Sequence, residues 1–253
     1  MSGRATSFGA VAEAYERYRP GYPAELVDLV LAYADRPVRN ALEIGAGTGK
    51  ATRVFADRGI LVTATEPDAA MLDVLRQHVP GTVVTVNDAL EDLRPSTTYD
   101  LVYVAAALHW TDAEGRWPRI AGLLEPGGTF ASFGGARQLA DPTVEAAVHE
   151  ARRPYLDTDD VPSPDGTPPT EPMQWPGTEL ERSPQFGDVQ QHVIELRTTL
   201  SAGDYVGHLS TVSAYLQLPA DQRRGALGRI LEVLPDPVEL IADVTLHLAR
   251  RIS

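Results

Sequence analysis

The sequence has no cysteine, a single lysine and few clusters of basic residues. The missing thiols exclude disulfide bonds and a cysteine nucleophile. The 35 acidic residues outnumber the 22 lysine and arginine residues, so the formal net charge is −13, and the longest basic runs are pairs such as Arg152-Arg153. Because such a charge repels polyanions, a nucleic-acid substrate is not expected.

Long apolar runs are missing as well. No stretch approaches the roughly 20 consecutive apolar residues that a membrane helix needs, and Met1–Pro23 has no apolar core of a secretory signal. We therefore expect a cytoplasmic protein without membrane contact. Its 253 residues, 43% of them apolar, suit one large domain or a domain with a cap. No metal site is predicted, and the sequence does not indicate an oligomeric state.

Apolar strands alternate with helical patterns through the first half of the chain. The near-continuous apolar run Tyr99–Leu108 is typical of a strand buried on both faces. This alternation predicts right-handed βαβ crossovers and a parallel sheet with helices on both faces. The expected strands are Asn40–Gly47, Ile60–Pro67, Thr82–Asp88, Tyr99–Leu108 and Gly128–Gly135, and the expected helices are Tyr22–Ala34, Thr48–Gly59, Asp68–Gly81 and Ala113–Gly128. Asp68 is the expected N-cap of its helix.

The pattern changes after Gly135. The proline-dense segment 154–184 is either a flexible surface loop or a lid over a substrate pocket, because long loops in compact domains are usually functional or disordered. The remaining segments expected here are the helices Asp141–Leu156, Tyr205–Tyr215 and Ala220–Leu234 and the strands Gln190–Leu200 and Pro237–Arg251.

Three glycines, Gly45, Gly47 and Gly49, occupy alternate positions after the first expected strand. A P-loop requires a glycine where Ile44 stands, so the turn is not a P-loop. The dinucleotide fingerprint requires a third glycine where Lys50 stands, which weakens a pyrophosphate site. The glycines would still let a ligand approach the backbone closely, because no Cβ is in the way.

The segment EIGAGTG, Glu43 to Gly49, resembles the cofactor loop of class I S-adenosylmethionine-dependent methyltransferases, and LLEPGGTF before the fifth strand resembles a turn of the same family. The resemblance covers residues 15–133. It implies an α/β, Rossmann-like, doubly wound sheet of seven mostly parallel strands with helices on both faces. The implied organisation is an N-terminal helical lid (1–38), a core that binds S-adenosylmethionine (39–135), and a part that completes the sheet and adds a substrate-binding cap and loop at about 153–190 (136–253).

Acidic residues follow the next two strands. Glu66 is suited to accept both ribose hydroxyls, and the resemblance implies that Asp88 and the Ala89 amide bind the adenine. Alternatively, Glu66 is a solvated acid and Asp88 caps a helix that starts at Leu90. Met71 lies either on the adenine face or in the core. The implied cofactor-binding residues are Arg19, Glu43, Gly45, Ala46, Gly47, Gly49, Glu66, Pro67, Met71, Asp88, Ala89 and Ala105.

The N-terminal segment YERYRPGYP resembles family members that methylate small acids and natural products, in which a mobile N-terminal helix closes over the cofactor. The resemblance implies that Tyr15 contacts the cofactor tail or the acceptor, and that Arg19 pairs with a carboxylate of one of them. Tyr18 and Tyr22 are further acceptor-binding candidates. The same tyrosine spacing also fits a helix face packed on the core.

His109 and Trp110 follow the fourth strand, beside the expected methyl position. His109 is the best candidate for the base that a hydroxyl or amine acceptor needs, although a histidine hydrogen-bonded within its own loop would look the same. The predicted catalytic residues are therefore His109 and Tyr15, and the predicted acceptor-binding residues are Tyr18, Tyr22, Trp110, Trp175 and His208.

We therefore predict a methyltransferase that uses S-adenosylmethionine and acts on a small molecule, with a natural-product intermediate or a small acid as possible acceptors. The loop Ala105–Leu108 lacks the Asn/Asp-Pro-Pro-aromatic motif of enzymes that act on nucleic-acid bases or glutamine. The alternatives are an oxidoreductase with a nicotinamide cofactor, and a cyclase-like protein that binds the cofactor without transferring methyl.

Overall fold

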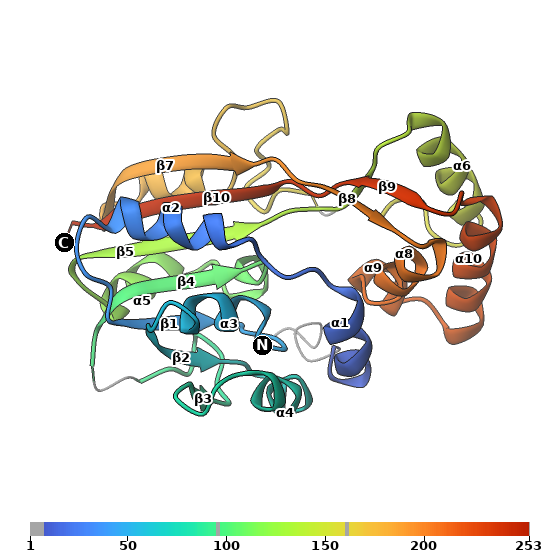
Figure 1. Cartoon of the computed structure of the whole chain (residues 1–253). Helices are drawn as coiled ribbons and strands as arrows, with labels where there is room; N and C mark the ends of the chain where they lie inside the picture. The colour runs from blue at the N-terminus through green and yellow to red at the C-terminus, as the bar shows by residue number, and fades with distance from the viewer. Residues whose placement is uncertain (1–7, 95–96, 160–161, 253) are drawn as a thin grey trace.

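The computed structural model describes residues 8–94, 97–159 and 162–252 (Figure 1). Its main sheet has seven strands, and the antiparallel β10 is the exception in an otherwise parallel arrangement. This confirms the predicted fold class. In spatial order the strands are β3 (Val84–Val86), β2 (Leu61–Thr65), β1 (Asn40–Ile44), β4 (Tyr99–Ala105), β5 (Leu124–Gly134), β10 (Val244–Arg251) and β7 (Phe186–Ile194).

Helices cover both faces of this sheet (Figure 1). Three of them contribute to the apolar cluster on one face: α2 (Ala24–Ala34), α3 (Lys50–Ala56) and α4 (Ala69–His78). The other face is covered by α5 (Arg116–Leu123) and α7 (Gly177–Arg182).

The core below α3 is aromatic. Phe55 of α3 stacks on Tyr103 of β4 with ring centroids 4.1 Å apart, and Phe133 of β5 stacks beside Tyr103 at 6.1 Å. Tyr22 meets Phe133 edge-on at 4.9 Å. This packing fixes the chain between α1 and α2 against the sheet, so it positions the segment that leads to the N-terminal helix.

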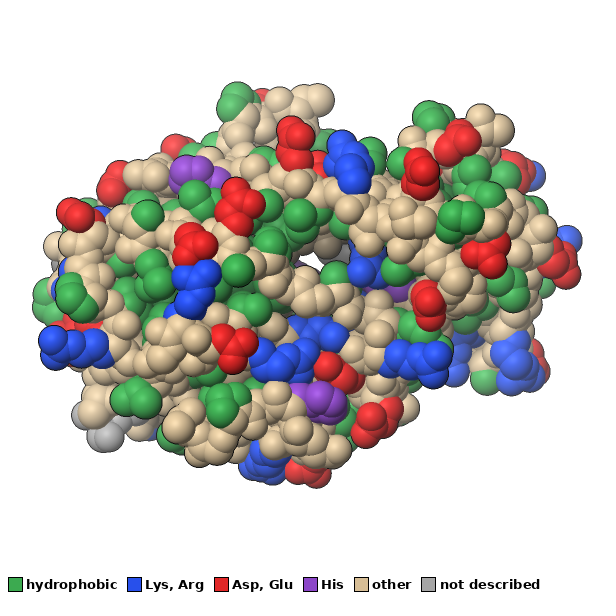
Figure 2. Space-filling view, viewed as in Figure 1, with side chains coloured by type: hydrophobic (Ala, Val, Ile, Leu, Met, Phe, Trp, Pro, Cys, Tyr) green, Lys and Arg blue, Asp and Glu red, His purple; other side chains and the backbone are tan. Residues whose placement is uncertain are grey.

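A second sheet, which the sequence did not predict, forms a cap beyond the ends of β4 and β5 together with four helices (Figure 1). Figure 2 shows that the molecular surface is hollowed to an opening between the cap and the main sheet. The cap consists of β6 (Gln138–Leu139), β9 (Val238–Ile241), β8 (Arg197–Leu200), α6 (Pro142–Arg152), α8 (Ala202–Leu209), α9 (Ser213–Leu216) and α10 (Ala220–Val233).

Two expected strands are in fact four. Gln190–Leu200 belongs to β7 and β8, and Pro237–Arg251 to β9 and β10, so each segment runs from one sheet into the other. At the crossing the Ala242 amide donates to Leu196 O, and the Leu196 amide donates to a carboxylate oxygen of Asp243, both at 2.9 Å. These two hydrogen bonds connect the β7–β8 and β9–β10 segments at the crossing, where neither sheet pairs them.

The expected helix Tyr205–Tyr215 is interrupted between α8 and α9. The hydroxyls of Ser210 and Thr211 donate to the carbonyls of Gly207 and His208 at 2.6 and 2.7 Å. Side-chain bonds of this kind compete with the helical ones. The break turns Thr211 toward the N-terminal segment, where it is bound by Arg19.

No helix in the part of the chain that the structure describes is both long and apolar enough to traverse a membrane. The first seven residues of the expected N-terminal lid lie outside the described residues. The rest of that segment, up to residue 38, comprises the short helix η1 (Gly9–Val11), the helix α1 (Ala12–Tyr18), the connection to α2, and α2 itself, which packs on the main sheet.

Candidate functional site

The glycine turn after β1 has left-handed backbone at all three predicted glycines: φ is +67° at Gly45, +58° at Gly47 and +84° at Gly49. A Cβ on Gly45 would lie 2.6 Å from the Cβ of Ala107, which follows β4. The methyl group of Ala107 therefore leaves no room for a side chain at Gly45. The turn ends at α3, with Gly49 as its N-cap residue.

Glu66 ties this turn to the next strand tip. Its two carboxylate oxygens accept hydrogen bonds from the amides of Gly47 and Asp68, each at 2.9 Å. Asp68 in turn caps α4, as predicted, by accepting from the amides of Ala70 and Met71. Burial raises the pKa of Glu66 to about 7, against the lowering effect of the two backbone bonds. The alternative of a solvated acid is wrong, because Glu66 is 6% exposed.

Glu43 lies below the turn and is fully buried. One of its oxygens, Oε2, accepts hydrogen bonds from the hydroxyls of Thr52 at 2.5 Å and Tyr103 at 3.0 Å. The other, Oε1, is buried without a partner among the described residues. Burial raises the pKa of Glu43 to about 8, although the two hydroxyl bonds lower it.

The tip of β3 stands beside Glu66. The Asn87 side-chain amide donates to the carbonyls of Glu66 and Pro67 at 2.7 and 3.0 Å, which joins the two strand ends. Asp88 and Ala89 follow directly and are half-buried. The alternative that Asp88 caps a helix is wrong, because the chain makes only a turn at residues 90–92.

Met71 is buried beside the glycine turn, which agrees with its expected core position. It is 4% exposed and packs in a small cluster with Ala12 and Tyr15. Its Cε atom is also 3.6 Å from the place where a Cβ of Gly47 would be, so it lies against the glycine turn. Ala46 is buried in the turn, and its amide donates to the Thr65 carbonyl at 2.9 Å.

The N-terminal segment covers the glycine turn. Tyr15 packs edge-on against Phe8, with ring centroids 6.0 Å apart. Burial raises the pKa of its hydroxyl, while Arg19 lowers this pKa and Glu66 raises it. The Gly9 amide donates to Asp68 at 2.9 Å. Tyr15 thus lies between Arg19 and the cofactor-binding candidate Glu66.

The other candidates of this segment face the cap and the core. Arg19 donates to the hydroxyl and carbonyl of Thr211 at 2.9 and 2.8 Å. Tyr18 fills the space over Gly207 of α8, where a Cβ would come within 2.5 Å of its ring. Tyr22 belongs to the main core, which agrees with the packing alternative for that residue.

Lys50, the single lysine, has a structural partner that the sequence did not reveal. Its ammonium donates to the Glu16 carbonyl at 2.6 Å and lies 3.5 Å from the Glu16 carboxylate, which also pairs with Arg53 at 2.9 Å. Glu16 lies on α1, so these bonds hold the N-terminal helix onto the start of α3. No local sequence pattern could have shown a pairing 34 residues apart.

The end of β4 brings His109 and Trp110 to the same edge of the sheet. After Ala105 the chain turns through Ala106, which has a φ of +52°, and enters the short helix η2 (Leu108–Trp110). The two rings are 4.6 Å apart. Burial lowers the pKa of His109, and the nearby Arg116 lowers it further, so its imidazole is neutral at physiological pH.

Arg116, which the sequence analysis missed, fixes the segment after His109. It is 2% exposed and donates to the hydroxyl and carbonyl of Thr111 at 2.8 and 3.0 Å, and to Glu179 of α7 at 3.2 Å. Trp175 lies over its guanidinium at 5.5 Å. Trp175 therefore packs behind the η2 segment.

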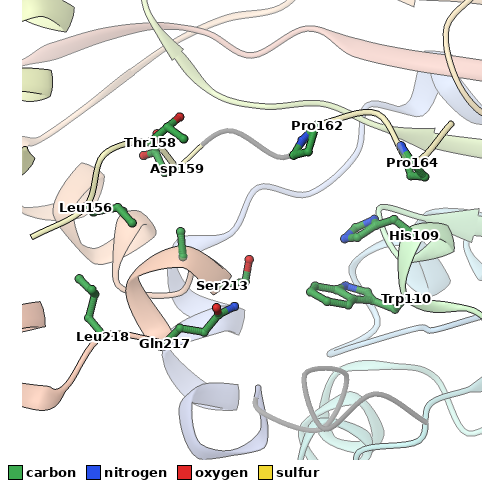
Figure 3. A pocket seen from close by; sticks show the side chains of 11 residues that line it. His109, Trp110, Leu156, Thr158, Asp159, Pro162, Pro164, Ser213, Gln217 and Leu218 are labelled. Atoms are coloured by element: carbon green, nitrogen blue, oxygen red, sulfur yellow. The ribbon is translucent and has the colours of Figure 1, made fainter. Parts of the chain in front are cut away.

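A cavity of about 560 Å³ opens between η2 and the cap. Figure 3 shows His109 and Trp110 on one side and Leu156, Gln217 and Leu218 across from them, with Asp159 and two prolines of the 154–184 segment along the rim. The structure thus brings His109 and Trp110 to the cavity. The other four acceptor-binding candidates, Tyr18, Tyr22, Trp175 and His208, are not among its described lining residues.

A parallel sheet with a glycine turn after its first strand, and buried acids at that turn and the next strand tip, defines a Rossmann-like nucleoside site. Residues 42–132 match the family model of the methyltransferase domain. A Mycobacterium tuberculosis protein named as an uncharacterized methyltransferase is 32% identical over 228 residues, which span 90% of this chain and 85% of the relative. The chain belongs to the class I S-adenosylmethionine-dependent methyltransferase family.

Two further similarities agree with this. Trans-aconitate 2-methyltransferase of an Acidovorax species is 27% identical over 120 residues, 46% of each chain. A solved structure from Anaeromyxobacter dehalogenans, described as a candidate type II methyltransferase, is similar in fold, with a TM-score of 0.64, 22% identity, and coverage of 92% of this chain and 98% of that one. The nicotinamide-dependent alternative is not favoured.

The site fits S-adenosylmethionine by two observations. Glycines at the three left-handed positions keep side chains off the turn, and the buried Glu43 Oε1 has no partner among the described residues. Residues at the tips of β1, β2 and β3 would hold the nucleoside and the charged tail. Two predictions follow from this geometry.

Gly45→Ala is expected to weaken binding of S-adenosylhomocysteine at least about tenfold, because the new methyl group collides with Ala107 and displaces the end of β4. Gly59→Ala is the matched control: φ is +77° there, but nothing lies within 4 Å of the added Cβ. Both variants should lose roughly 1–2 kcal/mol of unfolding free energy from the left-handed backbone. Calorimetric titration that finds equal affinities for the two variants would contradict the assignment of the turn.

Glu43→Gln is expected to flatten the pH dependence of stability without ligand. The folded-state pKa of Glu43, about 8, lies above its ordinary value of 4.5, so the folded protein binds this proton more tightly than the unfolded chain. The unfolding free energy should therefore fall between about pH 4.5 and 8, by up to about 1.4 kcal/mol per pH unit. Urea unfolding at pH 5.5 and 7.5 measures this slope. The exposed Glu232→Gln should keep the wild-type slope, and an unchanged slope in Glu43→Gln would refute the prediction.

Proposed function

We propose that this methyltransferase acts on a small molecule held in the cavity between the η2 segment and the cap. The observation that carries the proposal is the cavity itself. Its volume of about 560 Å³ is within the usual range for small ligands, and its lining joins the predicted base His109 to Trp110 and to cap side chains (Figure 3).

The chemistry needs positioning more than covalent catalysis. When bound, S-adenosylmethionine supplies a methyl carbon on a positively charged sulfur, which an acceptor lone pair attacks while the carbon–sulfur bond breaks and leaves its electrons on sulfur. The neutral imidazole of His109 accepts the proton that a hydroxyl or amine acceptor loses. Trp110 shapes the pocket beside it, and Arg116 holds the loop through Thr111.

The N-terminal segment acts as the lid in this proposal. Its contacts are side-chain bonds that can open and close, namely those of Glu16 with Lys50 and Arg53, and of Arg19 with Thr211. Tyr15 then faces the cofactor tail, and Tyr18 closes against α8. Closure excludes water from the methyl group, which favours transfer to the acceptor over side reactions.

A small acceptor is supported by charge and by a relative. The net charge of −13 disfavours polyanionic substrates. Trans-aconitate 2-methyltransferase, which shares the core region, is named for a small acid. A cytoplasmic location, predicted from the sequence, agrees with a metabolite as acceptor.

The size of the acceptor can be tested directly. Protein incubated with methyl-labelled S-adenosylmethionine should label a low-mass fraction of a metabolite extract, and should leave total RNA and denatured cell protein unlabelled. Filtration followed by scintillation counting separates these substrates. Label that appears in RNA or protein alone would refute the small-molecule acceptor.

His109→Ala should lower the turnover of the labelled acceptor by roughly 100-fold or more, since a general base contributes about that much. The affinity for S-adenosylhomocysteine should stay within about threefold of wild type. His149→Ala, an exposed histidine on α6, should behave as wild type in both assays. Full turnover in His109→Ala would show that this imidazole is not the base.

A further inference from the structure

Three basic side chains converge where the N-terminal segment, the sheet and the cap meet. Arg19 follows α1, Arg137 lies between β5 and β6, and His208 lies on α8. Their proximity shows in their mutual effects, because Arg19 lowers the pKa of Arg137, and both arginines lower the pKa of His208 after burial has lowered it most. The protein is strongly acidic overall, yet two arginine cations lie here beside an imidazole whose lowered pKa keeps it neutral.

This cluster lacks an acidic partner. No carboxylate of the described residues forms an ion pair with Arg19 or Arg137. Arg137 donates a long hydrogen bond, 3.4 Å, to the Tyr18 carbonyl, and its Nε is buried with no partner among the described residues. His208 is 6% exposed, and its Nδ1 likewise has no partner in the described part of the chain.

Leaving partly buried arginines without an acidic partner costs folding free energy. Burial lowers the pKa of both arginines, which means that their charged forms are poorly solvated. Both arginines are half-buried, and such cations are more stable when they are paired; an arginine with free donors matches the geometry of a carboxylate. The described residues provide no anion for this cluster, so an anionic ligand would complete it.

The cluster adjoins the acceptor cavity. Arg19 is bound to Thr211, two residues before Ser213, which lines the cavity. The described lining residues include no lysine or arginine, and the carboxylate of Asp159 is taken up by Arg152 and Tyr215. A negative charge on the acceptor therefore finds no lysine or arginine in the described lining itself.

Acidic and basic side chains occupy different ends of the site. The buried acids Glu43 and Glu66 lie at the cofactor end, which suits a ligand with a positive sulfur and an ammonium group. The basic residues lie toward the cap, and Nε and Nη2 of Arg19 donate to Thr211 rather than to the glycine turn. We propose that Arg19, Arg137 and His208 form a subsite for a carboxylate of the methyl acceptor, an inference that rests on the proposed function.

Arg137→Gln tests this subsite, with Arg137→Lys as the variant that keeps the charge and Arg229→Gln, an exposed arginine on α10, as the control. A metabolite extract is separated by anion exchange into retained and flow-through fractions, and each is offered with methyl-labelled S-adenosylmethionine. Wild type and Arg229→Gln should label the retained fraction. Arg137→Gln should lose at least about tenfold of this activity at limiting extract, and Arg137→Lys should retain part of it.

Two controls separate the sources of an anion. S-adenosylhomocysteine should bind all variants with similar affinity in calorimetry. A tenfold loss of its binding in Arg137→Gln would assign the site to the cofactor's own carboxylate and overturn the proposal. Phosphatase treatment of the retained fraction should leave it active, since loss of activity would assign a phosphate instead.

The remaining outcomes are also decisive. Label that appears in the flow-through fraction would show an uncharged or cationic acceptor and refute the carboxylate subsite while leaving the methyltransferase assignment intact. Label in neither fraction, with S-adenosylhomocysteine still bound, would refute the small-molecule acceptor itself, and the subsite would fall with it.

Discussion

The carboxylate of Glu66 is the constraint on which the site depends. By accepting from Gly47 and Asp68 it holds the glycine turn and the start of α4 in one arrangement. Asp68 then caps α4 and also receives the Gly9 amide, so the same few bonds position the N-terminal segment. A buried acid that is satisfied by backbone amides keeps a rigid shape and needs no second side chain.

The parts of the molecule are held together by different kinds of contact. The sheet and its helices meet through apolar packing around Phe55 and Tyr103. The N-terminal segment is held both by apolar contacts, such as that of Tyr22 with Phe133, and by the polar bonds of Glu16 and Arg19. These polar bonds join the segment to α3 on one side and to the cap on the other.

Local patterns were enough to predict the core, because strand alternation, the glycine turn and the Asp68 cap all depend on neighbours in sequence. The cap was predicted less well. Nothing in the segment 237–251 marks the point at Asp243 where the chain changes sheets, since the bonds that end β9 there come from the distant Leu196. Arg137 and Lys50 were missed for the same reason, as their neighbours come from α1 and its end.

The crossing of two strands between the sheets determines how such a cap can be exchanged. The chain enters and leaves the cap twice, and β8 and β9 continue directly from β7 and into β10. The cap is thus no inserted module with a single pair of junctions. Grafting it from a relative would require matched cuts within paired strands, so natural diversification of this enzyme is more easily achieved by replacing individual side chains than by shuffling whole segments.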